Sequence, residues 1–91
     1  MKHYKIQVRG KVQGVFYRKS TKEAAEFLGV KGWVKNLPDG SVQIEAQGEG
    51  QSLLKLVEWC QKGPKNAVVK GVEVKELRDE PISFSSFEVV N

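Results

Sequence analysis

The sequence predicts an α+β fold in which two helices cover one face of an antiparallel sheet. Three observations lead to this prediction. Several segments alternate apolar and polar residues with the period of a strand, and two segments repeat apolar residues with the period of a helix. A strong turn signal, Pro38-Asp39-Gly40, separates two of the strand-like segments. The segments also follow the order strand, helix, two strands, helix, strand.

The chain opens with a predicted strand from Tyr4 to Val12, where apolar or small residues occupy every second position. Residues 13–18 contain a glycine and are expected to form a loop. Helical spacing covers residues 19–28, and Gly29 is expected to end this helix because glycine readily adopts a left-handed conformation. The expected apolar stripe of the helix consists of Ala24, Phe27 and Leu28. The expected capping box at its start consists of Ser20 and Glu23.

Two strands are predicted next, over residues 30–37 and 42–47. Asp39 and Gly40 lie between them, and an Asp-Gly pair between apolar runs favours a hairpin because the turn needs positive φ. The second of these strands alternates valine, isoleucine and alanine with glutamine and glutamate. One of its faces is therefore expected to be buried.

A second helix follows, with Ser52 as its expected N-cap and Gly63 as its expected end. Its apolar stripe consists of Leu53, Leu56, Val57 and Cys60, at positions i, i+3, i+4 and i+7. A fourth strand is predicted over residues 68–77, and Phe87 with Val89 indicates a short fifth strand. Together these elements give the split βαβ, or ferredoxin-like, arrangement.

Length and composition limit the classes of protein to which this chain can belong. Ninety-one residues suffice for one domain, so residues 1–91 are expected to form a single domain. The net charge of +4 favours an anionic partner. A single cysteine excludes an intrachain disulfide and favours a reducing compartment. Residues 1–9 lack a continuous apolar run, so neither a signal peptide nor a membrane span is expected, and the cytoplasm is the expected location.

The residues with the clearest chemical meaning lie in the loop before the first helix. They are Gln13, Gly14, Val15, Phe16, Tyr17 and Arg18. Consecutive backbone N–H groups in such a loop can form a concave anion-binding nest, and the helix N-terminus adds a partial positive charge. The planar guanidinium of Arg18 fits two phosphate oxygens. The loop is therefore interpreted as a phosphate cradle, with a glycine turn beside a solvated arginine as the alternative.

Other phosphate-binding loops are excluded by position. A Walker loop needs glycines where Gln13 and Arg18 stand, and a loop with a cysteine nucleophile needs cysteine where Val12 stands. Tyr17 carries the only hydroxyl of the loop, and an ordinary tyrosine pKa of about 10 makes it a poor nucleophile at neutral pH. If this loop takes part in hydrolysis, water is therefore expected to attack directly.

Residues 10–18, with the sequence GKVQGVFYR, resemble the loop signature of the acylphosphatase family, G-x-V-Q-G-V-x-F-R. Residues 32–48 resemble its second signature, G-[WYF]-V-[KR]-N-x-x-x-G-x-V-x-x-x-x-x-G, at every fixed position. With the order of strands and helices, the resemblance covers nearly the whole chain. It implies a ferredoxin-like domain that hydrolyses the carboxyl–phosphate bond of acyl phosphates.

The resemblance also implies roles for individual residues. Arg18 and the N–H groups of residues 13–18 would hold the phosphate, and Asn36 would orient the attacking water. The implied substrate is a small acyl phosphate, with inorganic phosphate as product and inhibitor. Such substrates carry a good leaving group, so positioning and charge stabilisation by an arginine and a neutral amide suffice. No metal, cofactor or membrane is expected to take part, and a monomer is expected.

Two positions depart from the family pattern. Tyr17 stands where the family usually has phenylalanine, so its hydroxyl either finds a buried partner or points outward. Residues 87–91 lack the arginine or tyrosine that some members have there. A contact between this end of the chain and the site is therefore not expected.

A binding module is the alternative to an enzyme. RNA-binding domains with an RNP1 motif share the same order of elements, but here Lys11 stands at the first aromatic position of the nearest match, and the third strand has no aromatic residue. A non-catalytic anion sensor is expected to lack Arg18 or Asn36, and both are present. His3, expected near an exposed terminus, and Cys60, expected in the core, are too few for a structural zinc site.

Overall fold

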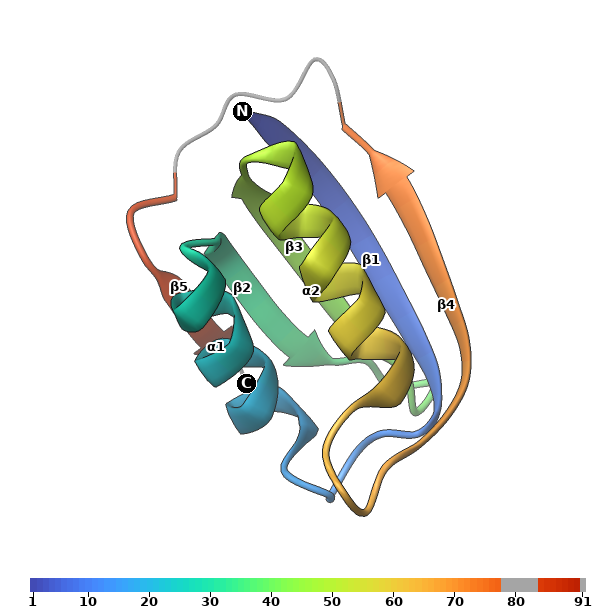
Figure 1. Cartoon of the computed structure of the whole chain (residues 1–91). Coiled ribbons are helices and arrows are strands. Elements are labelled where there is room, and N and C mark those ends of the chain that lie inside the picture. The colour runs from blue at the N-terminus through green and yellow to red at the C-terminus, as the bar shows by residue number, and fades with distance from the viewer. Residues whose placement is uncertain (78–83, 91) are drawn as a thin grey trace.

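The computed structural model describes residues 1–77 and 84–90. Its elements in chain order are β1 (Lys2–Lys11), α1 (Tyr17–Leu28), β2 (Lys31–Asn36), β3 (Val42–Gly48), α2 (Gly50–Lys62), β4 (Val68–Glu76) and β5 (Phe87–Val90). The five strands form one sheet in the order β4-β1-β3-β2-β5, and both helices lie on the same face of it (Figure 1). This is the ferredoxin-like α+β fold that the sequence predicts.

The direction of the last strand refines the predicted antiparallel sheet. The pairs β1–β3, β1–β4 and β2–β3 are antiparallel, whereas β5 pairs with β2 in parallel, Gly32 opposite Phe87. The sheet is therefore mixed, with a parallel strand added at the β2 edge. This addition places β5 along β2, with Val90 opposite Lys35 near the C-terminal end of β2.

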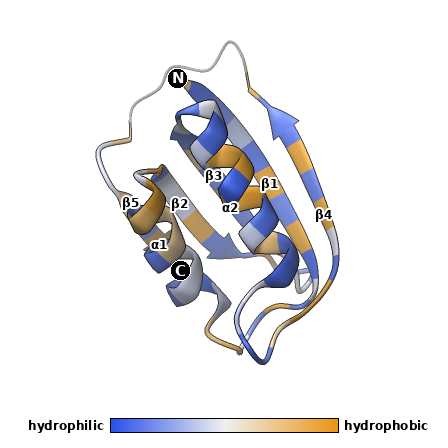
Figure 2. Ribbon diagram, in the orientation of Figure 1, coloured by the Kyte–Doolittle hydropathy of each residue, from blue (hydrophilic) through white to orange (hydrophobic). Residues whose placement is uncertain are grey.

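The core lies between the sheet and the two helices. Along β1 the buried Tyr4, Ile6 and Val8 alternate with polar residues, and Figure 2 shows this alternation of hydropathy along the strand. Val34 on β2 and Ile44 on β3 are also fully buried. The period of two seen in the sequence thus places one apolar face of each central strand under the helices.

The end of β1 bends at a bulge before it enters the loop. The pairing of β1 with β4 shifts register between Arg9 and Gly10, and Gly10 has a φ of 129°. A Cβ atom at this position would lie 2.2 Å from the carbonyl oxygen of Val68, so only glycine fits. The bulge directs the chain away from the ladder and into residues 13–16.

Helix α1 begins earlier than the sequence predicts. It starts at Tyr17, so Ser20 already lies inside it and its backbone N–H donates to the carbonyl oxygen of Phe16 at 3.0 Å. The predicted capping box of Ser20 and Glu23 is therefore wrong. The buried face consists of Tyr17, Thr21 and Ala25, with Ala24 and Leu28 partly buried.

Phe27 does not belong to the buried stripe of α1. Its side chain is 90% exposed, contrary to the prediction that it shares the apolar stripe. At about 100° per residue, it lies roughly 120° around the helix from Thr21, which is fully buried. Gly29, with a φ of 73°, ends the helix as predicted.

Helix α2 follows its predicted stripe but not its predicted cap. Leu53, Leu56 and Cys60 are fully buried, as expected. The helix begins at Gly50 after Glu49, so Ser52 is its third residue and the prediction of Ser52 as N-cap is wrong. Within residues 1–77 and 84–90, neither helix is long and apolar enough to cross a membrane.

Candidate active site

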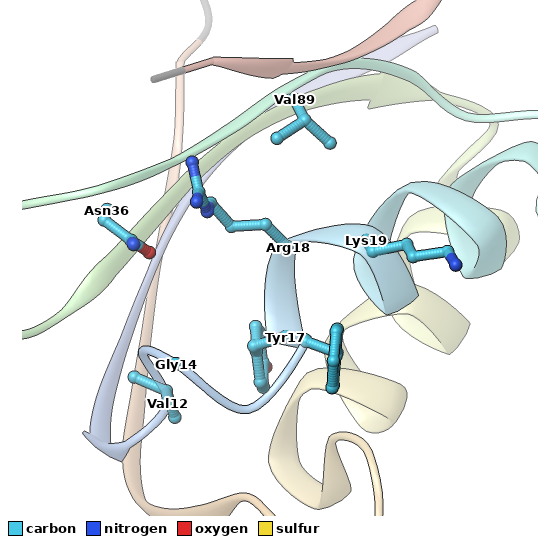
Figure 3. A pocket seen from close by; sticks show the side chains of 8 residues that line it. Val12, Gly14, Tyr17, Arg18, Lys19, Asn36 and Val89 are labelled. Carbon is cyan, nitrogen blue, oxygen red and sulfur yellow. The ribbon is translucent and has the colours of Figure 1, made fainter.

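A pocket of about 300 Å³ opens between the start of α1, the end of β2 and strand β5 (Figure 3). It is lined by Val12, Gly14, Phe16, Tyr17, Arg18, Lys19, Asn36 and Val89. Its walls thus come from three parts of the chain that are far apart in sequence. The first part is the loop region that the sequence singles out, the second holds Asn36, and the third is the last strand.

The loop that forms one wall contains two residues in the left-handed conformation. Gly14 has a φ of 73° and Phe16 a φ of 62°. Alternating right- and left-handed residues turn successive backbone N–H groups toward one concave side, which is the geometry of an anion-binding nest. Phe16 has a Cβ atom and pays about 1–2 kcal/mol for this conformation. Such strain is concentrated at functional sites in proteins.

Arg18 lies in the first turn of α1 and extends across the pocket toward Asn36 (Figure 3). Its Nη1 donates to the backbone carbonyl oxygen of Val90 at 3.1 Å. The expectation that the C-terminal end makes no contact with the site is therefore wrong. The contact uses a main-chain carbonyl, so it does not need the arginine or tyrosine side chain that some family members have there.

Asn36 is the last residue of β2, and its side chain points toward the space in front of Arg18 (Figure 3). Its Oδ1 atom is buried and has no hydrogen-bond partner among the described residues. A buried polar atom without a partner is costly unless a ligand or water satisfies it. Asn36 thus combines a place in the pocket lining with an amide oxygen that has no partner within residues 1–77 and 84–90.

Gln13 and Val15, although part of the predicted loop, do not line this pocket with their side chains. Val15 is buried in the core. The side-chain Nε2 of Gln13 donates to two carbonyl oxygens of the β2–β3 turn, those of Leu37 and Ser41, both at 2.8 Å. The loop therefore contributes some residues to the pocket and uses others to attach itself to the rest of the fold.

The side chain of Tyr17 is 1% exposed and points away from the pocket opening into the helix layer. Its hydroxyl donates to the carbonyl oxygen of Cys60 at 2.8 Å. That carbonyl lies in the last turn of α2, where Pro64 has no N–H to offer it. The phenol thus caps α2, and this explains how tyrosine is accommodated where the family usually has phenylalanine.

Tyr17 cannot act as a nucleophile. Burial, followed by the charge and the hydrogen bond of Cys60, raises the pKa of Tyr17 well above its ordinary value, so the hydroxyl remains protonated. Burial likewise raises the pKa of the Cys60 thiol to about 12. Direct attack by water, which the sequence favours, is consistent with both groups being inert.

The pocket has a cationic lining. Arg18 and Lys19 both contribute to it, and its eight lining residues include no acidic side chain. The amine of Lys19 points away from the guanidinium of Arg18, so the two charges flank different sides of the helix start (Figure 3). Lys19 and Val89 lie outside both signatures, so the sequence does not mark them as site residues.

His3 lies at the other end of β1. Its side chain is buried, contrary to the expectation of an exposed terminus, and its Nε2 lies 3.0 Å from Oε1 of Glu45. In residues 1–77 and 84–90, three or more His, Cys, Asp or Glu side chains do not gather into a group that would hold a metal ion.

Comparison with known proteins identifies the family. The family model for acylphosphatase matches residues 4–89. The chain belongs to the acylphosphatase family. It is 54% identical over 90 residues to an acylphosphatase of Rubrobacter xylanophilus, a match that covers 97% of this chain and 79% of the relative. An acylphosphatase of Marinobacter nauticus is 56% identical over 72 residues, covering 79% of this chain and 78% of that protein.

Solved structures agree with the sequence comparison. The crystal structure of acylphosphatase from Bacillus subtilis is similar with a TM-score of 0.95 and 34% identity, and the match covers 100% of both chains. The structure of an acylphosphatase from Coxiella burnetii has a TM-score of 0.90 and 43% identity, covering 98% of this chain and 92% of that one. The predicted family, fold and enzyme class, an acylphosphatase, are therefore confirmed.

Proposed function

We propose that this acylphosphatase hydrolyses the carboxyl–phosphate bond of small acyl phosphates in the pocket between α1, β2 and β5. One observation carries the proposal: Arg18, a left-handed loop at a helix start and Asn36 line one pocket, and the amide oxygen of Asn36 has no hydrogen-bond partner among the described residues. The first two suit a phosphate group, and the third suits a water molecule. The two signatures in the sequence support the same assignment.

In this mechanism the phosphate group of the substrate lies in the concave side of residues 13–18, against the N–H groups and the guanidinium of Arg18. Asn36 Oδ1 accepts a hydrogen bond from a water molecule and holds its oxygen in line with the bond to be broken. The water oxygen forms a bond to phosphorus, and the bond between phosphorus and the acyl oxygen breaks. The carboxylate leaves with the bonding electron pair, and the proton of the water passes to a phosphate oxygen.

This chemistry requires little from the protein beyond placement and charge. The leaving carboxylate is stable as an anion, so a strong general base is not needed. Arg18 and the helix start stabilise the charge that spreads over the phosphate oxygens in the transition state. Asn36 contributes by holding the water at the reacting distance. We further propose that inorganic phosphate competes for the same place and that the protein works as a cytoplasmic monomer.

The RNA-binding alternative finds less support. The two central strands present mainly Lys5, Gln7, Gln43 and Glu45 to the face that the helices leave open. Recognition of single-stranded RNA on such a sheet relies on aromatic side chains in the central strands for base stacking. The half-buried aromatic ring of Trp33 lies on β2 and is covered on one side by the amine of Lys35, 5.1 Å from the ring centre.

The test is hydrolysis of a synthetic aryl acyl phosphate after exhaustive treatment with a chelator. We expect full activity with chelator present and competitive inhibition by inorganic phosphate. Activity that disappears with the chelator and returns with a divalent ion would contradict the metal-free mechanism. Inhibition by phosphate that leaves KM unchanged would contradict a shared binding place. Analytical ultracentrifugation at the assay concentration tests whether the protein is a monomer.

A further inference from the structure

We propose that Gln13 is a positioning residue that fixes the distance between the phosphate-binding loop and Asn36. The inference rests on the proposed function, because it assigns Gln13 a role through the water-orienting amide. The side chain of Gln13 does not line the pocket, so it is not a ligand of the substrate. Its two hydrogen bonds instead join the two halves of the site.

The need for such a link follows from the sheet order. The loop continues from β1, whereas Asn36 ends β2, and β3 lies between these two strands. No ladder of hydrogen bonds therefore connects β1 to β2 directly. Asn36 pairs with Val42 of β3, so the ladder places its backbone, but the loop beyond Lys11 has left the sheet. The placement of this loop relative to Asn36 therefore depends on contacts outside the ladders.

Gln13 supplies this contact with both hydrogens of its amide nitrogen. One bond goes to the carbonyl oxygen of Leu37 and the other to the carbonyl oxygen of Ser41, each at 2.8 Å. Leu37 is bonded covalently to Asn36. The Gln13 amide therefore links the loop to the backbone that carries Asn36.

The turn that receives these bonds is itself closed by hydrogen bonds. The N–H of Leu37 donates to the carbonyl oxygen of Ser41 at 2.8 Å, and the N–H of Gly40 donates to that of Leu37 at 3.1 Å. Both acceptors of the Gln13 amide thus accept a second hydrogen bond within the turn. The Oδ1 of Asp39 accepts from the N–H of Ser41 at 2.9 Å and from its hydroxyl at 2.6 Å. Gln13 is consequently tied to a turn with little freedom of its own.

Asn36 depends on this support because its own side-chain oxygen is held by no hydrogen bond within the described residues. Its position is set by the backbone and by packing alone. Catalysis is sensitive to such placement, since a displacement of about 1 Å can cost about 100-fold in rate. Loss of the Gln13 bonds should therefore lower turnover more than it lowers phosphate affinity, because the left-handed residues that shape the loop remain.

The experiment compares Gln13→Met, which keeps the length of the side chain but removes the donor, with Gln13→Glu, which places a carboxylate opposite two carbonyl oxygens. We expect kcat to fall about 10- to 100-fold in Gln13→Met, while the Kd for inorganic phosphate changes less than about twofold. Gln13→Glu should be worse, because acceptor faces acceptor. Circular dichroism and thermal unfolding establish that each variant is folded.

Gln47 provides a matched control at the opposite end of the sheet. Like Gln13, which is half-buried, the buried Gln47 uses its Nε2 to donate to a backbone carbonyl oxygen, that of Phe84 at 3.2 Å. Gln47→Met should lower the unfolding temperature and leave both kcat and KM unchanged. If Gln47→Met lowers kcat as strongly as Gln13→Met does, the effect reports general loosening of the fold and the positioning role is wrong.

A double-mutant cycle with Asn36→Ala decides whether Gln13 acts through Asn36. We expect Gln13→Met to cost less than about threefold in kcat when Asn36 is already alanine. Independent, multiplicative losses would overturn the inference while the proposed function stands, because Asn36→Ala alone would still lose turnover. If Asn36→Ala alone keeps full turnover, the water-orienting role fails first and the inference fails with it.

Discussion

Two buried amide oxygens of the same sheet lack hydrogen-bond partners among the described residues, and they lie at opposite ends of the β2–β3 ladder. Asn36 lines a pocket of about 300 Å³, together with Arg18 and residues of the left-handed loop. Gln47 is the strand partner of His3, whose side chain forms a hydrogen bond with the side chain of Glu45. The same local irregularity therefore has chemical meaning only at the end where a cavity and a cation accompany it.

The largest expected effect is the difference in kcat between variants that lack one or the other of these two amide side chains. Asn36→Ala should lose about 10²–10³-fold in kcat and retain its affinity for phosphate, because the lost contact is made mainly to the attacking water. Gln47→Ala should retain kcat and lose only stability. Steady-state kinetics with phosphate titration by calorimetry measures both. A sharp rise in KM at constant kcat in Asn36→Ala would instead make Asn36 a substrate-binding residue.

Asn36→Asp sharpens this end of the comparison. The change is nearly isosteric, but it places a negative charge beside the bound phosphate, where like charges repel. We expect weaker phosphate binding together with lost turnover, in contrast to Asn36→Ala, which loses turnover alone. Equal phosphate affinity in the two variants would show that the side chain lies too far from the phosphate for the role proposed.

The next largest effect is expected on phosphate affinity, from changes to Arg18, the cation found at the Asn36 end of the ladder. Arg18→Lys keeps the positive charge but loses the planar fork. Each charged hydrogen bond is worth about 1.5–3 kcal/mol, so we expect the affinity for phosphate to fall at least about tenfold, nearly as far as in Arg18→Ala. Calorimetry measures the affinity directly. If Arg18→Lys binds phosphate as the parent protein does, the pocket is a simple charge patch.

A smaller effect is expected at the helix layer behind the pocket. Tyr17→Phe removes the hydroxyl that donates to the carbonyl oxygen of Cys60. Because Pro64 cannot replace this donor, the buried carbonyl loses its partner and the free energy of unfolding should fall by about 1–3 kcal/mol. Denaturant unfolding measures the change. An unaltered midpoint would show that another donor reaches Cys60 in the variant.

The smallest effect is expected in the turn beside Asn36. The hydroxyl and then the N–H of Ser41 lower the pKa of Asp39, with Arg9 acting in the same direction. A lowered folded-state pKa stabilises the fold above the ordinary value of 3.8, and this contribution is lost as the pH falls through the lowered pKa. Asp39→Asn should therefore be less stable than the parent at neutral pH and equal to it at the acid end of a pH series of thermal unfolding. A constant difference across the series would contradict the role of the charge.

Sequence patterns predicted the sheet and helices because burial on one face imposes periods of 2 and 3.6. The helix starts were less predictable, because neither depends on a capping side chain: Phe16, in a left-handed conformation, precedes the first residue of α1, and Glu49 precedes the first residue of α2. Ser20 and Ser52 suit the N-cap position by residue type, yet both lie inside their helices. The predicted caps failed because backbone geometry, not local propensity, starts these helices.

Site residues that belong to a sequence signature were predictable. Residues that reach the site only through the pairing of distant strands were not. Arg18 and Asn36 line one pocket, as their signatures suggest. Val89 joins them because β5 pairs in parallel with β2, a choice that no local pattern in a four-residue strand determines. The hydrogen bonds of Gln13 were also unpredictable, because the residue type of a loop glutamine does not indicate which distant carbonyl oxygens accept from it.

The pairing of β5 with β2 has a consequence for the order in which the protein is made. A ribosome releases the chain from its N-terminus, so β1 to β4 and both helices emerge before β5 does. Such a nascent chain holds all four antiparallel strands but lacks the Val89 wall of the pocket. The contact from Arg18 to Val90 spans 72 residues, one of the longest loops that the chain must close. Synthesis therefore delivers the scaffold first and the finished pocket last.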